Sequence, residues 1–259
     1  MNDQVLKVVK IGGKLIENEE SLSVFLKDFS SLQGPKILVH GGGNLATEIA
    51  SKLGYETKMV DGRRITDKNS MQVITMVYAG LINKQIVAKL QALDINAIGL
   101  CGADGKSIIS KKRPAKEIDF GFVGDVVSIN TSFINSLLDQ GITPVFSAIS
   151  YDNEGQLLNT NGDSVAADIA TAMAKICETE LLYCFEKKGV LADATNNDSV
   201  IEILDQNKYQ ELLENKVISD GMLPKLHNCF QALNNGVSQV SLGDAGLLKK
   251  NAIHTKIIK

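Results

Sequence analysis

Short apolar runs alternate with segments of helical periodicity over the first hundred residues. The segments are, in order, 6–11, 21–32, 36–40, 43–53, 68–92 and 97–100. Strands that are buried on both faces of a sheet read as continuous apolar runs, and helical crossovers join such strands when they are parallel. The pattern therefore predicts an α/β fold with a central, mainly parallel sheet.

The middle of the chain breaks this rhythm. Residues 106–130 form shorter, more polar runs that are punctuated by turns, which is typical of antiparallel strands inserted at an edge. The alternation then resumes, with helices and strands expected at 131–140, 142–149, 163–177, 181–185, 206–214, 222–235 and 237–242. Nothing reads as a linker, so we expect two lobes, residues 1–177 and 178–259, that share one sheet.

Composition excludes several classes of protein. The chain has 259 residues, 44% of them hydrophobic, and a formal net charge of −3. It can bury a core of ordinary size, and it lacks the basic stripe of a nucleic-acid-binding protein. The apolar run at the start is shorter than that of a signal peptide, and no uninterrupted apolar stretch is long enough to span a bilayer. We expect a cytoplasmic protein that binds neither nucleic acid nor a membrane.

The cysteines do not indicate a metal site. The chain has four, and none forms a C-x-x-C pair. Widely spaced cysteines without such pairs are typical of reduced, buried thiols rather than of zinc ligands or a disulfide framework. We therefore predict no protein-bound metal.

The first candidate binding site is the glycine-rich segment that follows the strand predicted at 36–40. Residues 36–46 read KILVHGGGNLA, a strand followed by three glycines and then a helix. Glycines at such a junction let backbone N–H groups approach an anion, and the helix contributes its positive end. The spacing of Gly41, Gly43 and Ala46, with Asp61 further on, also fits a dinucleotide fingerprint, so an NAD-binding Rossmann protein is an alternative.

Three further segments carry charged residues that are candidates for a functional site. Lys10 is the penultimate residue of the first strand and precedes Gly12 and Gly13, which suits a polyphosphate site. Asp163 opens a predicted helix, where a carboxylate is favourable. Lys225 lies in the first turn of another helix, where the helix dipole disfavours a cation, and such local conflicts are typical of functional sites.

Taken together, five motifs resemble the amino acid kinase family, and most closely its members that act on N-acylated glutamate. They are KIGG (10–13), HGGG (40–43), DGRRIT (61–66), GQLLNTNGD (155–163) and SDGMLPK (219–225). Each is weak alone, but the ordered set covers essentially the whole chain. The resemblance implies an open three-layer α/β sandwich, the amino acid kinase fold, with an N-terminal lobe that binds the acyl amino acid and a C-terminal lobe that binds ATP.

The resemblance also implies roles for individual positions. Lys10 and Lys225 match two lysines that stabilise the transferring phosphoryl group, and Asp163 matches the aspartate that orients them. The positions that match substrate contacts are Gly42, Gly43, Arg64 and Asn159. Those that match nucleotide contacts are Gly12, Gly13, Glu186, Lys187, Lys188, Gly189, Val190, Leu191, Val217, Ile218 and Ser219. The family usually has Ser or Thr followed by Asp where this chain has Phe185 and Glu186.

The implied reaction is consistent with these residues. A glutamate side chain has a pKa of about 4.3, so it is an ionised nucleophile at neutral pH without a base. The enzyme would supply cations and backbone amides, with ATP as co-substrate and Mg²⁺ carried on it. The acceptor would be N-acetyl-L-glutamate or N-succinyl-L-glutamate, as in arginine biosynthesis, and the alternatives within the family are carbamate, aspartate, glutamate or UMP.

The resemblance leads to one expectation about regulation. Members of the family that are inhibited by arginine carry an extra N-terminal helix, and this chain reaches its first strand within about five residues. We therefore expect an arginine-insensitive homodimer.

Overall fold

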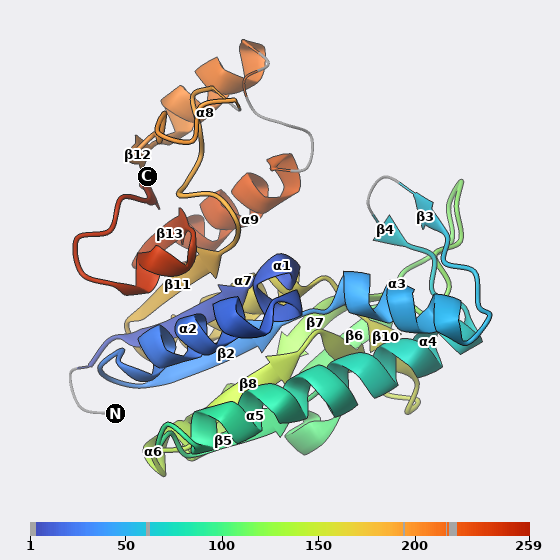
Figure 1. The fold of residues 1–259 in the computed structure, drawn as a ribbon. Helices are drawn as coiled ribbons and strands as arrows, with labels where there is room; N and C mark the ends of the chain where they lie inside the picture. The colour runs from blue at the N-terminus through green and yellow to red at the C-terminus, as the bar shows by residue number, and fades with distance from the viewer. Residues whose placement is uncertain (1–3, 61–62, 194, 216, 218–221) are drawn as a thin grey trace. The chain divides into compact units, whose positions relative to one another are not determined.

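The computed structural model describes residues 4–60, 63–193, 195–215, 217 and 222–259 (Figure 1). The chain divides into two compact units. One comprises Met1–Lys36 and Ala166–Lys259, and the other comprises Ile37–Val165. The boundary on the C-terminal side falls inside helix α7 (Gly162–Met173).

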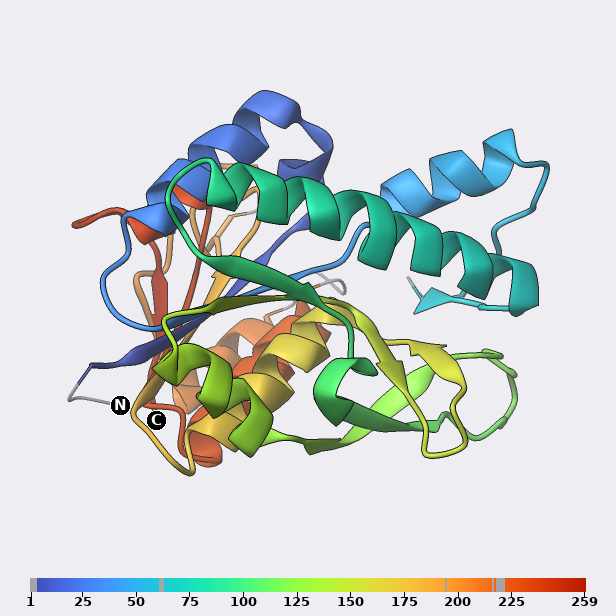
Figure 2. The same cartoon turned by 90° about the horizontal axis from the view of Figure 1, so that it is seen from below.

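The continuous unit is built on three parallel strands, in the order β2 (Lys36–His40), β8 (Thr143–Ser147) and β5 (Ala97–Leu100). Helix α5 (Asn83–Gln91) packs on one face of these strands and α6 (Thr131–Asp139) packs on the other (Figure 2). All five residues of β2 and all five of β8 are buried. The continuous apolar pattern of these runs is therefore explained by helices on both faces.

A second sheet lies in the same unit, in the order β10 (Leu157–Asn159), β9 (Ile149–Tyr151), β6 (Ile108–Lys112) and β7 (Gly124–Ile129). β6 and β7 are antiparallel, as predicted for residues 106–130, but they belong to this separate sheet and not to an edge of the sheet that contains β2, β8 and β5. The run predicted as one strand at 142–149 divides at Ala148, because β8 pairs with β2 and β9 pairs with β10. A two-stranded ribbon, β3 (Met59–Val60) with β4 (Arg63–Arg64), completes the unit.

The longest helix of this unit changes its hydrogen-bonding pattern in the middle. It begins as α4 (Lys68–Ile74), becomes the π-helical segment η1 (Thr75–Ile82) and ends as α5. By length and composition this 24-residue helix, which contains an 18-residue window with a mean hydropathy of 1.2, would suffice to cross a membrane, but 44% of that window is buried in the protein. Core helices of water-soluble proteins share these properties, so the helix is weak evidence for a membrane span. Helix α3 (Gly43–Lys52) packs against α4 and η1.

The described residues of the discontinuous unit form five strands, in the order β12 (Ile203–Leu204), β14 (Thr255–Ile257), β13 (Gln239–Gly243), β11 (Thr179–Cys184) and β1 (Leu6–Ile11). Only β13 and β14 are antiparallel neighbours among these pairs. Helices α2 (Glu19–Ser30, blue) and α9 (Leu223–Asn234, red-orange) lie on opposite faces of the strands (Figure 2). Helix α8 (Gln206–Glu214) contacts α9 through the rings of Tyr209 and Phe230, whose centroids are 5.1 Å apart.

The observed elements confirm the predicted α/β class with mainly parallel central strands. Short elements were not predicted: α1 (Gly13–Glu17), β10, β12, and the 3₁₀ turns η2 (Asp104–Lys106) and η3 (Ala245–Leu248). The two compact units are not the two contiguous lobes expected from the sequence, since the first 36 residues group with the C-terminal part of the chain. Those lobes are defined by what they bind, and their assignment stays a prediction.

Candidate functional site

The glycine loop after β2 lies close against the π-helical segment. A Cβ atom on Gly42 would lie 2.2 Å from Ile82 Cδ1 and 3.1 Å from Tyr78 Cδ1, and its φ of +153° is one that residues with a side chain rarely adopt. Gly42 is also the N-cap of α3 and supplies no capping side chain. No capping side chain occupies the start of α3, so its backbone N–H groups could receive an anionic group, and this role stays a prediction.

Arg64 reaches this loop from β4. Its guanidinium donates to the Gly43 carbonyl oxygen at 2.8 Å, to Thr47 Oγ1 at 2.6 Å and to Thr57 Oγ1 at 3.0 Å. These three bonds orient the guanidinium beside the N-terminus of α3. The structure thus brings together Arg64, Gly42 and Gly43, three of the residues that the resemblance assigns to the substrate.

Tyr78 is a residue of this cluster that sequence reasoning missed. Its side chain is buried, and its hydroxyl lies 3.8 Å from the position of a Cβ on Gly43. Burial raises the pKa of Tyr78, and the charge of Arg64 partly offsets that rise. A tyrosine within the apolar stretch TMVYAGLI was the available signal, because a buried hydroxyl usually has a polar neighbour.

Asn159 lies at the end of β10 and is linked to the same region through Thr66. Its Nδ2 donates to Thr66 Oγ1 at 3.0 Å, and Thr66 Oγ1 donates to the Arg64 carbonyl at 3.3 Å. Backbone bonds hold both residues to the 120–122 segment, Thr66 N to Phe120 O and Asn159 N to Phe122 O. Two hydrogen bonds through Thr66 therefore connect Asn159 to the backbone of Arg64.

Asp163 lies in the first turn of α7, as predicted. It is not the capping side chain, because Asn161 Oδ1 accepts from the N–H groups of Asp163 and Ser164 at 2.9 and 3.1 Å. A capping asparagine already satisfies these first-turn donors. Helix capping therefore does not explain the carboxylate of Asp163.

The first glycine loop lies in the discontinuous unit, at the end of β1. Gly12 N donates to the Cys184 carbonyl at 2.8 Å, and a Cβ on Gly12 would lie 3.1 Å from that oxygen. Glycine thus allows the loop to lie close to the end of β11, and Gly13 then begins α1.

Tyr183 lies next to both Lys10 and Lys225, the two lysines that are predicted to stabilise the transferring phosphoryl group. It is the register partner of Lys10 in the parallel pair β1 and β11, so their side chains emerge on the same face. The ammonium of Lys225 lies over the Tyr183 ring at 5.1 Å from its centroid and over the Phe185 ring at 5.6 Å. The ring faces attract a cation, so these two contacts help to hold the Lys225 ammonium in place.

The loop that follows β11 contains the largest group of predicted nucleotide contacts. Val190 N donates to Thr255 Oγ1 at 2.8 Å, and a Cβ on Gly189 would lie 2.5 Å from the same oxygen. Lys187 donates to Asn197 Oδ1 at 2.9 Å, Lys188 pairs with Asp198 at 2.7 Å, and Leu191 bridges to Val200. The loop is therefore tied to residues 197–200 and to β14. Val217 N bonds to Leu212 O at 3.0 Å, and the other two predicted contacts, Ile218 and Ser219, lie outside the described residues.

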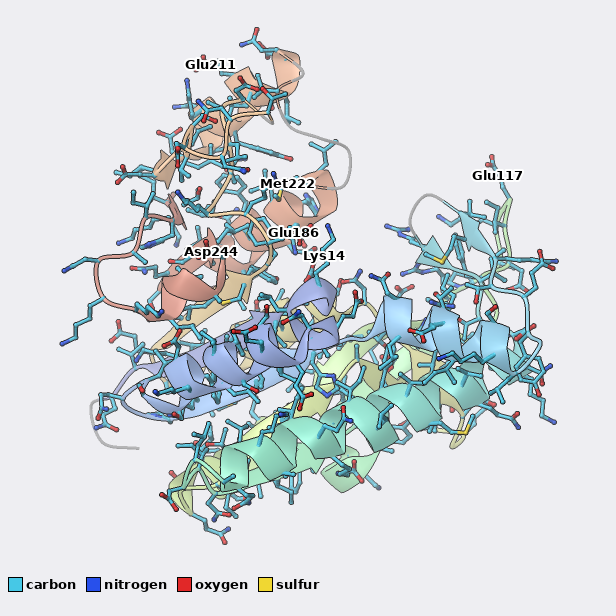
Figure 3. The ribbon with its side chains drawn as sticks, in the orientation of Figure 1. Lys14, Glu117, Glu186, Glu211, Met222 and Asp244 are labelled. Atoms are coloured by element: carbon cyan, nitrogen blue, oxygen red, sulfur yellow. The ribbon has the colours of Figure 1, made fainter. Side chains whose placement is uncertain are left out.

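Glu186, the departure from the family pattern, pairs with a lysine of the first glycine loop. Lys14 Nζ lies 3.2 Å from Glu186 Oε1, and Figure 3 shows the two side chains next to each other. Partial burial raises the pKa of Glu186, but the hydrogen bond from Lys14 and the charges of Lys14 and Lys225 outweigh it, so the pKa lies below its usual value. The Glu186 carboxylate therefore interacts with two cations, Lys14 next to the first glycine loop and Lys225.

We expect Glu186→Gln to lower the KM for ATP by up to about fivefold, and Lys14→Ala to raise it by a similar factor. Neutralising Glu186 removes a charge that repels phosphates and frees Lys14 to face them. The effects are small because both side chains are about half exposed or more, 67% for Lys14 and 48% for Glu186, and exposed pairs contribute about 0.2–1 kcal/mol. Steady-state kinetics checks this, with exposed Glu178→Gln as the control. Equal KM values in both variants and wild type would contradict it.

His40, the residue before the three glycines, is fully buried. Burial lowers its pKa from 6.5 to about 4; the hydrogen bond to the Gly41 carbonyl opposes this shift and the charge of Lys84 reinforces it. The folded protein therefore keeps the imidazole neutral through a range of pH in which the unfolded chain binds a proton.

We expect this histidine to make the free energy of unfolding fall as pH drops from about 6.5 to about 4. In that range the unfolded state binds more protons, so stability rises with pH, by about 1.4 kcal/mol per pH unit at most for one group, and the effect is absent above pH 6.5. Burial raises the pKa of Asp168 to about 6, which gives the opposite slope. Urea unfolding of wild type and His40→Gln at several pH values isolates the histidine. Parallel curves for the two proteins would contradict the prediction.

Comparison with known proteins places these observations in context. The chain matches the amino acid kinase family over residues 6–244. It is 50% identical over 261 residues to the acetylglutamate kinase of Cytophaga hutchinsonii, covering 98% of this chain and 99% of the relative. It is 49% identical over 247 residues to the acetylglutamate kinase of Phocaeicola vulgatus, covering 95% and 96%. The solved structure of smu.665 from Streptococcus mutans superposes with a TM-score of 0.79 at 26% identity, covering 97% and 98% of the two chains.

Proposed function

This chain belongs to the amino acid kinase family, and from that premise we propose that it transfers the γ-phosphoryl group of ATP to the side-chain carboxylate of N-acetyl-L-glutamate. The observation that carries the proposal is an identity near 50% over almost the full length of both chains with proteins named acetylglutamate kinase. The matched regions cover 95% and 98% of this chain and therefore include residues of both units. An NAD-binding function and the other kinase activities considered from the sequence are not favoured.

The acceptor would bind at the cluster in the continuous unit. Arg64, already oriented by Gly43, Thr47 and Thr57, would grip the α-carboxylate, since a guanidinium matches a carboxylate with two parallel hydrogen bonds. The amides of Gly42 and Gly43 would receive an anionic oxygen, and Asn159 would bind the neutral N-acyl amide. A free α-ammonium would place a cation where that amide is expected and would let the acyl phosphate cyclise.

Phosphoryl transfer would depend on the two lysines and Asp163. Lys225 is held over the rings of Tyr183 and Phe185, and Lys10 emerges on the same face as Tyr183. The two ammonium groups would stabilise negative charge on the transferring group, and Asp163 would keep them oriented. The nucleophilic carboxylate is ionised at neutral pH, so no histidine is needed as a base.

Mg²⁺ would be carried mainly on the phosphate oxygens of ATP, where it neutralises developing charge. Among residues 4–60, 63–193, 195–215, 217 and 222–259, no group of three or more His, Cys, Asp or Glu side chains could hold a metal ion. A kinase that leaves the metal on its nucleotide does not require such a group. The residues that would meet the nucleotide are the glycine loop at 12–13 and the segments 186–191 and 217–219.

We also propose that the enzyme is a cytoplasmic homodimer. The apolar side chains of Met76 and Leu81 on η1 are 54% and 41% exposed. Met76 and Leu81 are five residues apart in a segment whose bonds run from i to i+5, so they share a side of the helix. A second copy would cover this surface. Sedimentation of wild type and of a Met76→Lys/Leu81→Lys variant tests this, because a monomeric wild type would overturn the proposal. Arginine insensitivity also stays a prediction.

Coupled release of ADP tests the activity directly. We expect ADP release that requires both MgATP and N-acetyl-L-glutamate, and none with carbamate, aspartate, free glutamate or UMP. Release with one of those acceptors instead would support another kinase of the family. Absence of release with every acceptor, by a protein shown to be folded, would contradict the kinase assignment.

The acyl group is tested by comparing kcat/KM for N-acetyl-L-glutamate and N-succinyl-L-glutamate. The relatives named above are acetylglutamate kinases, and the succinyl group adds a carboxylate that would need a further cation. We therefore expect the acetyl compound to be the better substrate. A higher kcat/KM for the succinyl compound would change the substrate but not the reaction.

A further inference from the structure

We propose that His40 and Asn83 form a buried positioning pair that holds the glycine loop at 41–43 in the shape that receives the acyl-glutamate. This inference rests on the proposed function for the identity of the ligand. Neither residue would touch the reacting atoms. Their role would be to fix the backbone of the glycine loop, which contacts the substrate.

The hydrogen bonds define which nitrogen of His40 carries the proton. Asn83 Nδ2 donates to the Val145 carbonyl at 2.9 Å and lies 3.0 Å from His40 Nε2. Lys84 Nζ donates to Asn83 Oδ1 at 3.2 Å. Because a carbonyl only accepts and an ammonium only donates, the orientation of the Asn83 amide is determined by its neighbours. His40 Nε2 therefore accepts, and Nδ1 carries the proton.

That proton is directed at the glycine loop. His40 Nδ1 lies 2.9 Å from the carbonyl oxygen of Gly41 and so donates to it. The imidazole thus connects two points: the loop at one nitrogen and Asn83 at the other. Its neutrality at physiological pH, due to burial, is what this arrangement requires, since a second proton on Nε2 would face the amide donor of Asn83.

Asn83 is itself anchored firmly. Its side chain is 1% exposed, and a Cβ on Gly99 would lie 1.8 Å from its Oδ1. The space over β5 is therefore left open by a glycine and filled by this amide. Through His40, Val145 and Gly99, Asn83 contacts all three parallel strands of the unit.

The same helix supports the glycine loop at a second point. Asn83 directly follows the π-helical segment, and Ile82 and Tyr78 within that segment contact the position of the Gly42 side chain. π-Helical segments are rare and occur frequently at functional sites. Here, the segment ends where one residue packs on Gly42 and the next binds His40. Without this support, three consecutive glycines could adopt many conformations. A displacement of about 1 Å in a group that positions the substrate can lower the reaction rate about a hundredfold.

Kinetics of single and double variants tests the pair. His40→Gln keeps an acceptor near the Nε2 position but loses the donor to Gly41, and Asn83→Ala removes the anchor. We expect each to raise the KM for N-acetyl-L-glutamate at least tenfold while the KM for ATP changes less than twofold. His40→Asn keeps a donor at the Nδ1 position but cannot reach Asn83, so adding Asn83→Ala to it should raise that KM less than twofold further. A merely structural role would change both KM values or neither.

Val39→Ala is the matched control, because Val39 is the fully buried neighbour of His40 in β2. It should lower the midpoint of urea unfolding and leave the KM for N-acetyl-L-glutamate within twofold. The proposal is overturned if Val39→Ala raises that KM as much as His40→Gln does. It is also overturned if Asn83→Ala leaves the KM unchanged.

Imidazole nitrogen NMR separates failure of this inference from failure of the proposed function. We expect His40 of wild type to be in the Nδ1–H form, and Asn83→Ala to give a mixture of tautomers. An Nε2–H form in wild type would overturn the pair whatever the substrate is. If wild type shows the Nδ1–H form but neither binds N-acetyl-L-glutamate by calorimetry nor phosphorylates it, the proposed function fails, and with it the assignment of the loop's ligand.

Discussion

Replacing Lys10 or Lys225 by alanine is expected to lower kcat by about 10²–10⁴-fold, with little effect on the free energy of unfolding. The loss of one preorganised donor to developing charge lowers kcat by about 10²–10³-fold in other enzymes, and a full positive charge next to a phosphoryl group contributes at least as much. Lys225 is held over two aromatic rings and Lys10 emerges beside one of them. Single-turnover measurement of ADP formation with saturating substrates checks the prediction.

The matched control for Lys10→Ala is Lys7→Ala, three residues earlier in the same strand. Lys7 Nζ donates to the Gln33 carbonyl at 3.1 Å, at the opposite end of β1 from the glycine loop. We expect its kcat to stay within twofold of wild type. Circular dichroism and urea unfolding must show that all three variants are folded. If kcat fell tenfold or less in both Lys10→Ala and Lys225→Ala, the roles assigned to these lysines would be wrong.

Arg64→Lys is expected to raise the KM for N-acetyl-L-glutamate about a hundredfold while leaving the KM for ATP within about twofold. A lysine keeps the charge but cannot form two parallel hydrogen bonds with a carboxylate, and a hydrogen bond to a charged group contributes about 1.5–3 kcal/mol. Its single nitrogen also cannot reproduce the guanidinium arrangement, in which one nitrogen donates to Gly43 and Thr47 and another donates to Thr57. Initial rates over a matrix of both substrate concentrations measure the two KM values.

Arg63→Lys provides the control, because Arg63 is the exposed neighbour of Arg64 in β4. The same substitution there should leave both KM values unchanged. If Arg64→Lys raised the KM for ATP as much as that for N-acetyl-L-glutamate, its role would be structural and not specific to the acceptor. An unchanged KM for the acceptor would remove Arg64 from the substrate site.

The long elements of the fold could be predicted from local pattern. Strands such as β2 and β8 are apolar at nearly every position because helices cover both faces, and this signal needs no knowledge of partners. Short elements such as β10 and β12 could not be predicted, since two or three residues carry no periodicity and exist as strands only through their neighbours. The π-helical segment at 75–82 could not be predicted from the sequence either, because its hydrogen bonds depend on how the helix packs.

The candidate site also has features that the sequence predicts and features that depend on the tertiary structure. Glycine loops, the misplaced lysine at 225 and the order of the motifs are local features, so the sequence by itself determined the α/β class, the family and the residue types that would meet two anions. Only the tertiary structure decided which distant residues meet: Arg64 with Gly43, Asn159 with Thr66, Tyr183 with the two lysines, and His40 with Asn83. The physical reason is that hydrogen bonds and ring contacts between residues far apart in the chain depend on strand register and helix packing, which no local pattern specifies.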